Sequence, residues 1–485
     1  MSIKMGHCRT VCAGTLAALL AAFSPVLRAD EGAGALLQGG ARVLEGVESL
    51  PEAAPSAPSA AAAEPLTVTP DACARIALEG NPRAALADEK TLGAAEAAAA
   101  VRAQRLPRVA TSAAYTYVSG LETEIYGSSL AKLLFQVDGF EAKKGTLTTK
   151  VAVEQVLFSG GQIRAGIRAS DYLAQSEEWK AAAERIALAA EARTACYDAM
   201  LAQAMVRVAE ESVAAFRRHL QDARNRLDQG VASEFEVLRA ETELKAREAD
   251  AESARTAEKL AFVNLRRILF LDDTREVTVA GEIPWDPLDT PVETLVARAL
   301  AARPELAALD RGIEAARQNV LVKRGAFYPK VAATAQYQQV DGGGKLMPDG
   351  FTLGMGAEWE FWPGGKRKHE LREAESQTRQ LELQRAGVAR LVETDVRQAH
   401  ARALEAVAKI KREKAASRLG EEGQELAELR FQEGAGIQAE TLDAELALTT
   451  ARTGLAKALR DYAVALTDLE RALGGGLPEA AQAEK

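Results

Sequence analysis

The sequence predicts a mainly α-helical protein with a small β part, built as an internal direct repeat. Three observations support this prediction. Aromatic residues make up only 5% of the 485 residues while Ala, Glu, Lys and Arg are abundant, a composition that favours long helices packed through small side chains. Four short segments alternate apolar and polar residues. The helical stretches and the alternating segments both occur twice, in the same order.

The N-terminal region has the features of an exported protein. A positive start, an apolar stretch and a small-residue cleavage site predict that residues 1–29 are a secretory signal peptide. Removing Lys4, Arg9 and Arg28 takes the formal net charge from −9 to −12, which argues against nucleic acid as a partner. Residues 30–65 are rich in Pro, Ala and Ser, and we expect a disordered linker there.

Four cysteines occur, and two of them remain in the mature chain. Neither Cys8 nor Cys12 follows an apolar stretch, so no N-terminal lipid is expected. Cys73 and Cys196 either pack as small apolar side chains or form one disulfide in an oxidising compartment. No run of about 20 apolar residues follows the signal, so no membrane-spanning helix is predicted.

An internal repeat organises the rest of the chain. Asn81 and Pro82 recur 222 residues later as Arg303 and Pro304. Further along, the offset falls to 204 residues, and the difference lies in a loop at the tip of the first strand hairpin. The predicted parts are repeat 1 (66–280, with hairpin 109–158), a linker (281–293), repeat 2 (294–474, with hairpin 331–361) and a C-terminal tail (475–485).

Each repeat contains one very long helix and shorter ones. No proline interrupts the run from Gln162 to about Arg226, which predicts roughly 65 residues or about 97 Å of helix. The matching run in repeat 2 extends from Lys366 to about Gln432. Residues 71–104 and 233–270 predict shorter helices, which together match one long helix in length and can stack end to end beside it.

The four predicted strands, at 109–117, 146–158, 331–339 and 352–361, place apolar residues on one face and polar residues on the other. This pattern is typical of an outer-membrane barrel, and also of a strand half-buried in a soluble sandwich. Helices of about 100 Å favour the first interpretation, since a sandwich offers them no partner. Four strands cannot close a barrel, and an open strand edge cannot face lipid. Three chains supply twelve strands, so a transport role predicts a homotrimer.

Sequence signatures of catalysis are absent. The segments after the Gly-Gly pairs lack phosphate-loop spacing, and His369 with Glu370 lacks the second histidine of a zinc motif. His219 and His400 stand alone within helices, where we expect solvated faces. We therefore expect no enzymatic activity, no cofactor and no metal site.

The two Gly-Gly motifs, the Asn-Pro opening and the paired segments 224–244 and 429–448 make the chain resemble the TolC-type outer-membrane efflux protein family over roughly residues 66–474. The resemblance implies a trimer with a twelve-stranded barrel in the outer membrane and a helical barrel reaching through the periplasm. It implies a passive, tip-gated duct of a tripartite efflux or type I secretion system. The implied partners are two further copies, outer-membrane lipid, a periplasmic adaptor (membrane fusion) protein and an inner-membrane transporter of RND, ABC or MFS type.

The resemblance also implies roles for particular residues. The strand-to-helix turns fall on Gly160, Gly161, Gly364 and Gly365. The periplasmic tip that docks the adaptor falls on Gly230, Val231, Gly434, Ala435 and Phe431. The pore aperture falls on Glu236, Glu440 and Asp443, whose carboxylates form a ring in a trimer; the alternative is that Glu440 and Asp443 only cap or solvate a helix.

The chain departs from the best-studied members of that family at the tip. Phe431 and Gly436 stand where those members latch the closed tip with Tyr and Arg, and neither replacement donates a side-chain hydrogen bond. We therefore expect the closed tip to be held differently. A competing interpretation of the whole chain is a periplasmic coiled-coil adaptor or scaffold without a transmembrane pore.

Overall fold

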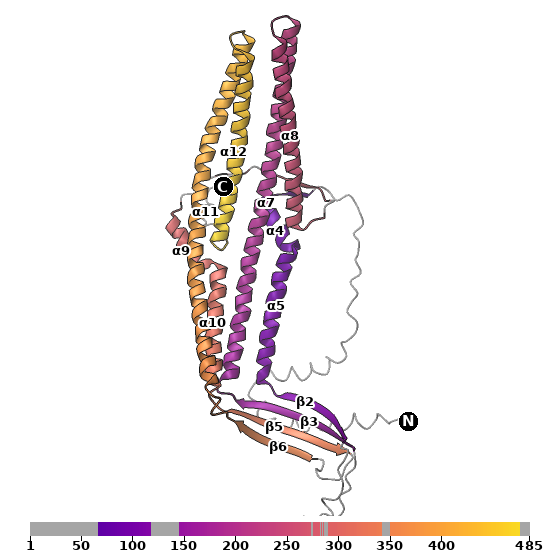
Figure 1. The fold of residues 1–485 in the computed structure, drawn as a ribbon, viewed down its shortest axis with the longest axis vertical. Helices are drawn as coiled ribbons and strands as arrows, with labels where there is room; N and C mark the ends of the chain where they lie inside the picture. The colour runs from indigo at the N-terminus through magenta and orange to yellow at the C-terminus, as the bar shows by residue number, and fades with distance from the viewer. Residues whose placement is uncertain are drawn as a thin grey trace, which may run out of the picture. The chain divides into compact units, whose positions relative to one another are not determined.

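The computed structural model describes residues 66–117, 145–272, 275–281, 283, 285, 290–341 and 350–475. The predicted signal peptide, the linker at 30–65, the tips of both strand hairpins and all but the first residue of the C-terminal tail lie outside these ranges. The described chain forms two compact units (Figure 1): a strand unit, made of the described residues within 105–158 and 330–359, and a helical unit, made of those within 66–104, 159–329 and 360–475.

Two very long helices dominate the helical unit. Helices α7 (Gln162–Asp228) and α11 (Lys366–Gln432) each contain 67 residues, as the uninterrupted sequence predicted. Each turns back into a shorter helix, α8 (Glu234–Leu269) or α12 (Gln438–Ala472), so the unit contains two helical hairpins. The remaining elements are α4 (Pro70–Gly80), α5 (Pro82–Arg102), η1 (Ala103–Arg105), α9 (Val292–Ala302), α10 (Pro304–Gly325) and the parallel strand pair β1 (Leu66–Val68) and β4 (Val277–Val279).

The prediction of one continuous helix over residues 71–104 was wrong. The helix breaks at Asn81, which is extended (φ −80°, ψ 128°) and begins α5 by accepting a hydrogen bond from the Arg83 amide at 2.9 Å. Pro82 causes the break, because a proline disfavours helical geometry in the residue before it and has no amide hydrogen to donate. Arg303 and Pro304 separate α9 from α10 in the same way.

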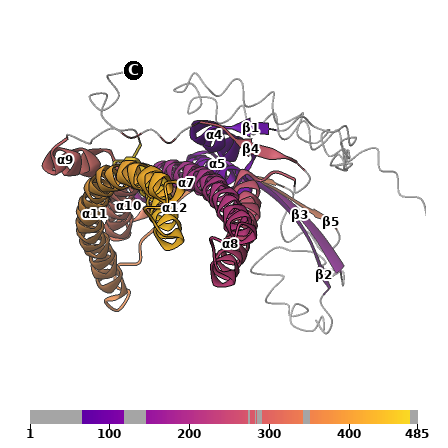
Figure 2. The same ribbon diagram turned by 90° about the horizontal axis from the view of Figure 1, so that it is seen from above.

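The helices lie side by side in one curved layer (Figure 2). Helix α7 contacts α5 and α10 toward its start and α8 and α12 toward its end (Figure 1), and α4 also packs on it. The side chain of Ser176 donates to the Ala308 carbonyl at 2.9 Å in the first half, and Arg452 pairs with Glu211 at 2.9 Å in the second. Helix α11 follows beyond α10 and α12. The layer therefore ends in α5 and α8 on one side and in α11 on the other.

Equivalent parts of the two repeats build equivalent cores. One core packs α4, α7 and α8 around Leu188 and Leu269, and the other packs α9, α11 and α12 around Ile410 and Tyr462. A third joins the hairpins near their tips through Phe216 of α7. Many of the buried residues are alanines, which allow close approach of helices in the way the composition predicted.

The strand unit is one antiparallel sheet with the order β2 (Arg108–Tyr117), β3 (Gly145–Phe158), β5 (Lys330–Asp341), β6 (Gly350–Glu358). Its register confirms one apolar and one polar face, because cross-strand partners share a face. One apolar row aligns Val109, Val153, Ala335 and Leu353, and the adjacent row on the opposite face aligns Arg108, Glu154, Thr334 and Gly354.

Two details of the predicted strands were wrong. Strand β6 ends at Glu358, not at Phe361, and Pro363 and two glycines follow before α11 begins. Leu157 does not continue the apolar face of β3, because a bulge lets Val156 pair with Ala332 and Phe158 with Val331, leaving Leu157 as the extra residue.

None of the helices described is both long and apolar enough to cross a membrane.

Candidate functional site

The two hairpin tips have the same backbone geometry. Gly230 and Gly434 follow the long helices with φ of 73° and 75°, a conformation that glycine adopts without steric cost. The amide of Val231 donates to the Arg226 carbonyl at 2.9 Å, and the amide of Ala435 donates to the Arg430 carbonyl at 2.8 Å. Both glycines, Val231 and Ala435 are exposed, as residues that dock a partner need to be.

The predicted aperture carboxylates lie in different surroundings. Glu440 is half-buried and its Oε2 lies 3.5 Å from Nη1 of Arg430 in the same tip, which offsets part of its charge. Asp443, one turn further along α12, is exposed. Glu236 belongs to the N-terminal cap of α8, where the Ser233 hydroxyl accepts from the Glu236 amide at 3.4 Å and donates to the Glu236 carboxylate at 3.3 Å.

Phe431 contacts the other hairpin. The guanidinium carbon of Arg226, at the end of α7, lies 4.2 Å from the centre of the Phe431 ring at the end of α11. This cation–π contact joins the tips of the two hairpins of one chain. Gly436 contributes no side chain, and a Cβ there would lie 3.2 Å from Arg430 atoms. Sequence analysis missed Arg226, because no local pattern links residues 205 positions apart.

A series of ion pairs, which we call the seam, continues this junction along α7 and α12. Glu211 pairs with Arg452 at 2.9 Å, Asp198 with Arg460 at 2.6 Å, and Arg193 with Glu470 at 2.7 Å. These side chains are between a quarter and about three fifths exposed, so each pair contributes modestly.

Two titratable groups are covered where the hairpins meet. Burial raises the pKa of the Glu445 carboxyl in α12, a residue only 7% exposed. Burial lowers the pKa of His219 in α7, whose Nε2 is buried without a hydrogen-bond partner. The expectation that His219 lies on a solvated face was wrong, because the residue is half-buried and its ring lies edge-on to the ring of Phe216, with 6.0 Å between ring centres, beside the core that joins the hairpins.

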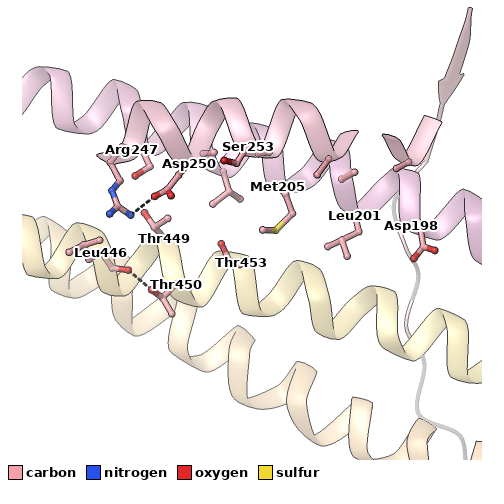
Figure 3. Close-up of a pocket in the computed structure, with 17 residues that line it drawn as sticks. Asp198, Leu201, Met205, Arg247, Asp250, Ser253, Leu446, Thr449, Thr450 and Thr453 are labelled. Carbon is pink, nitrogen blue, oxygen red and sulfur yellow. Dashed lines mark hydrogen bonds and ion pairs between the residues drawn. The ribbon is translucent and has the colours of Figure 1, made fainter. Parts of the chain in front are cut away.

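A groove of about 690 Å³ lies beside the seam (Figure 3). Helix α7 contributes Leu201 and Met205, and α12 contributes Thr449 and Thr453. On α8, Nη1 of Arg247 and Oδ2 of Asp250 pair at 2.9 Å. The wall is thus mostly apolar and hydroxyl-bearing, and its charged groups are already paired. No cluster of three metal-ligating side chains occurs among the residues the structure describes.

The Gly-Gly pairs directly precede the long helices. Gly161 and Gly365 have φ of 83° and 84° and begin α7 and α11. Gly160 is packed closely, since a Cβ there would lie 2.3 Å from the Gly325 carbonyl oxygen. The equivalent Gly364 has open space around it.

Solved structures share this arrangement. VceC, an outer membrane protein of Vibrio cholerae, aligns with a TM-score of 0.70 at 19% identity, covering 84% of this chain and 96% of that one. CusC, described in connection with transmembrane channel formation, aligns with a TM-score of 0.72 at 17% identity, covering 83% and 91%. The fold, two helical hairpins with a four-stranded sheet, is therefore that of the outer-membrane channels.

The amino-acid sequence shows which family the chain belongs to. The model of the outer membrane efflux protein family matches residues 75–269 and 295–475, one segment in each repeat, and the chain belongs to that family. A curated relative, outer membrane efflux protein BepC of Brucella suis biovar 1 (strain 1330), is 27% identical over 251 residues. That match spans about half of each protein, 49% of this chain and 52% of BepC. The chain is an outer-membrane protein that extends into the periplasm, and its family is one of channels, which favours the channel over the scaffold.

Proposed function

We propose that this chain is the outer-membrane component of a tripartite efflux or type I secretion system, a passive trimeric duct gated at its periplasmic tips. The observation that supports this most strongly is that the helical layer and the sheet each end in two open edges. In this proposal an inner-membrane transporter supplies the work. A periplasmic adaptor docks on the exposed tips around Gly230, Val231, Gly434 and Ala435.

Large apolar side chains mark both edges of the helical layer. Leu86 on α5 and Leu260 on α8 are 55% and 64% exposed, and Leu383 and Leu391 on α11 are 74% and 62% exposed. Isolated exposed leucines are ordinary, but here they stand on the helices at the two ends of one curved layer. Further copies of the same chain cover both edges, with α11 of one copy packed against α5 and α8 of the next.

The sheet supports the same assembly. Among the described strands β2 and β6 each have one neighbour, so their outer backbone groups are free to pair with another strand. The apolar face exposes Leu353 and Met355 by 66% and 75%. An apolar face can lie against lipid, but an unpaired strand edge cannot. Pairing of β6 with β2 of the next copy removes the free edges and leaves the apolar face toward lipid. Three copies supply twelve strands, which is wide enough for a pore.

The tips form the gate in this proposal. Three copies bring Glu440 and Asp443 to one constriction, where a ring of carboxylates attracts cations. The contact of Arg226 with Phe431 keeps the two hairpins of each chain together and so holds the constriction narrow. Opening requires the hairpins to separate, which the partly exposed seam permits at small cost.

The mass of the detergent-solubilised particle tests the assembly. We expect light scattering, with detergent subtracted, to give the mass of three chains. Leu391→Asp combined with Leu86→Asp places charge on both edges and should shift the particle toward monomers, while the matched pair Leu391→Met and Leu86→Met should stay trimeric. A stable wild-type monomer would contradict the proposal.

A further inference from the structure

The two cysteines of the predicted mature chain lie together. Cys73 belongs to α4 and Cys196 to α7, both side chains are 0% exposed, and the two thiols lie close enough to influence each other's pKa. Both belong to the core that also contains Leu188 and Leu269. They are thiols in this structure.

Chance explains this proximity poorly. A buried residue touches 6–12 others, so in a described chain of some four hundred residues the odds that two given positions meet are roughly one in forty. The fold does not demand cysteine at either position, because at the offsets of the repeat the second copy carries Leu295 and His400 there. Two cysteines therefore occur together in one copy and neither occurs in the other.

We propose that Cys73 and Cys196 form an intramolecular disulfide in the exported protein. The reaction joins the two Sγ atoms, releases two protons and passes two electrons to a protein dithiol–disulfide oxidant, whose own S–S bond is reduced to two thiols. The periplasm is an oxidising compartment in which such bonds persist. Because both sulfurs are fully buried, exchange takes place during folding, before α4 closes over α7.

The crosslink fixes the first helix of the described chain. Helix α4 has only 11 residues and is separated from α5 by the break at Asn81, so local structure alone does not hold it in place. A covalent bond to α7 anchors α4 and the preceding strand β1. The inference depends on export and not on the channel activity proposed above.

Thiol counting with peptide mapping tests the bond. The protein is purified without reductant, denatured, and treated with N-ethylmaleimide before or after reduction. We expect no modification before reduction, two additions after it, and a digest that links the peptide of Cys73 to that of Cys196. Two additions without reduction, with the signal peptide shown to be absent by intact mass, would overturn the proposal.

Variants separate the bond from simple packing. Cys73→Ala and Cys196→Ala should each expose one reactive thiol in denaturant, and the double variant none. The double variant should unfold roughly 5 °C or more below the oxidised wild type, yet keep the mass of the wild-type particle. If the oxidised wild type and the double variant unfold together and the wild type shows two free thiols, the cysteines only pack. A normal disulfide in a monomeric particle would sustain this inference while refuting the proposed trimer.

Discussion

Replacing Arg226 by alanine tests the gate directly. In the structure the Arg226 guanidinium stacks on the Phe431 ring at 4.2 Å and so joins the tips of the two hairpins. The replacement removes this contact and leaves the seam of ion pairs further along the helices unchanged. If the contact holds the closed tip, its loss favours separation of the hairpins.

The magnitude follows from the number of copies. A cation–π contact at a partly exposed site is worth about 0.5–1 kcal/mol. Three copies in one trimer make about 1.5–3 kcal/mol, and since 1.4 kcal/mol corresponds to a factor of ten, the ratio of open to closed channels should rise about 10- to 150-fold. Phe431→Ala should produce the same rise, and Phe431→Tyr, which keeps an aromatic face, should not.

Single-channel recording in planar bilayers measures this ratio as open probability. The matched control is Arg224→Ala, which removes the same charge close by on α7 but from a pair with Glu241 inside one hairpin. The double variant Arg226→Ala, Phe431→Ala should open no more than either single variant, because both remove the same contact. Equal opening by Arg224→Ala would assign the effect to the lost charge. Additive effects in the double variant would show that the two residues act independently, and either result would refute the contact as the interaction that holds the closed tip.

Three further predictions concern stability. Gly160→Ala should lower the unfolding temperature more than Gly364→Ala. Both positions have positive φ, but only at Gly160 would a Cβ meet backbone, at 2.3 Å. Differential scanning calorimetry measures both unfolding temperatures, and equal losses would contradict the prediction. Burial raises the pKa of the Glu445 carboxyl in the folded state. The contribution of Glu445 to stability is therefore fully present below its pKa in the unfolded state, and it is lost as the pH rises through its pKa in the folded state. Glu445→Gln should therefore raise the unfolding temperature at about pH 8 and not at about pH 4, and a stabilisation equal at both values would exclude burial of charge as its cause. Burial lowers the pKa of His219 in the folded state, so stability should fall, with proton uptake on unfolding, as the pH drops below the pKa of His219 in the unfolded state. His219→Phe should make stability depend less steeply on pH in that range. An unchanged dependence would assign the effect to other groups.

Much of the fold could be predicted because its signals are local. The long helices α7 and α11 begin after Gly-Gly pairs and contain no proline, so their predicted ends lie within about two residues of those observed. The break at Asn81 was predictable from Pro82, but the predicted helix ran through it. The alternation of apolar and polar residues predicted which face of each strand is apolar. It did not predict the bulge at Leu157, which depends on the partner strand.

The site was harder to predict because its contacts join distant parts of the chain. The turn glycines follow from local chemistry, but the stacking of Arg226 on Phe431 depends on how two hairpins meet. His219 and Glu445 lie in helices whose periodicity shows one apolar face, and their burial comes from a second hairpin that periodicity does not reveal.

The short pair of parallel strands β1 and β4 brings the two ends of the first repeat together. Residues Leu66 and Val277 are partners in this pair, so the chain enters and leaves the first repeat at nearly the same point in space. A unit whose ends coincide can be followed by another copy of itself without disturbing its own packing. The two copies of the repeat therefore need only a short connector between them, and each keeps its own packing, so equivalent positions such as Gly160 and Gly364 can differ in their surroundings.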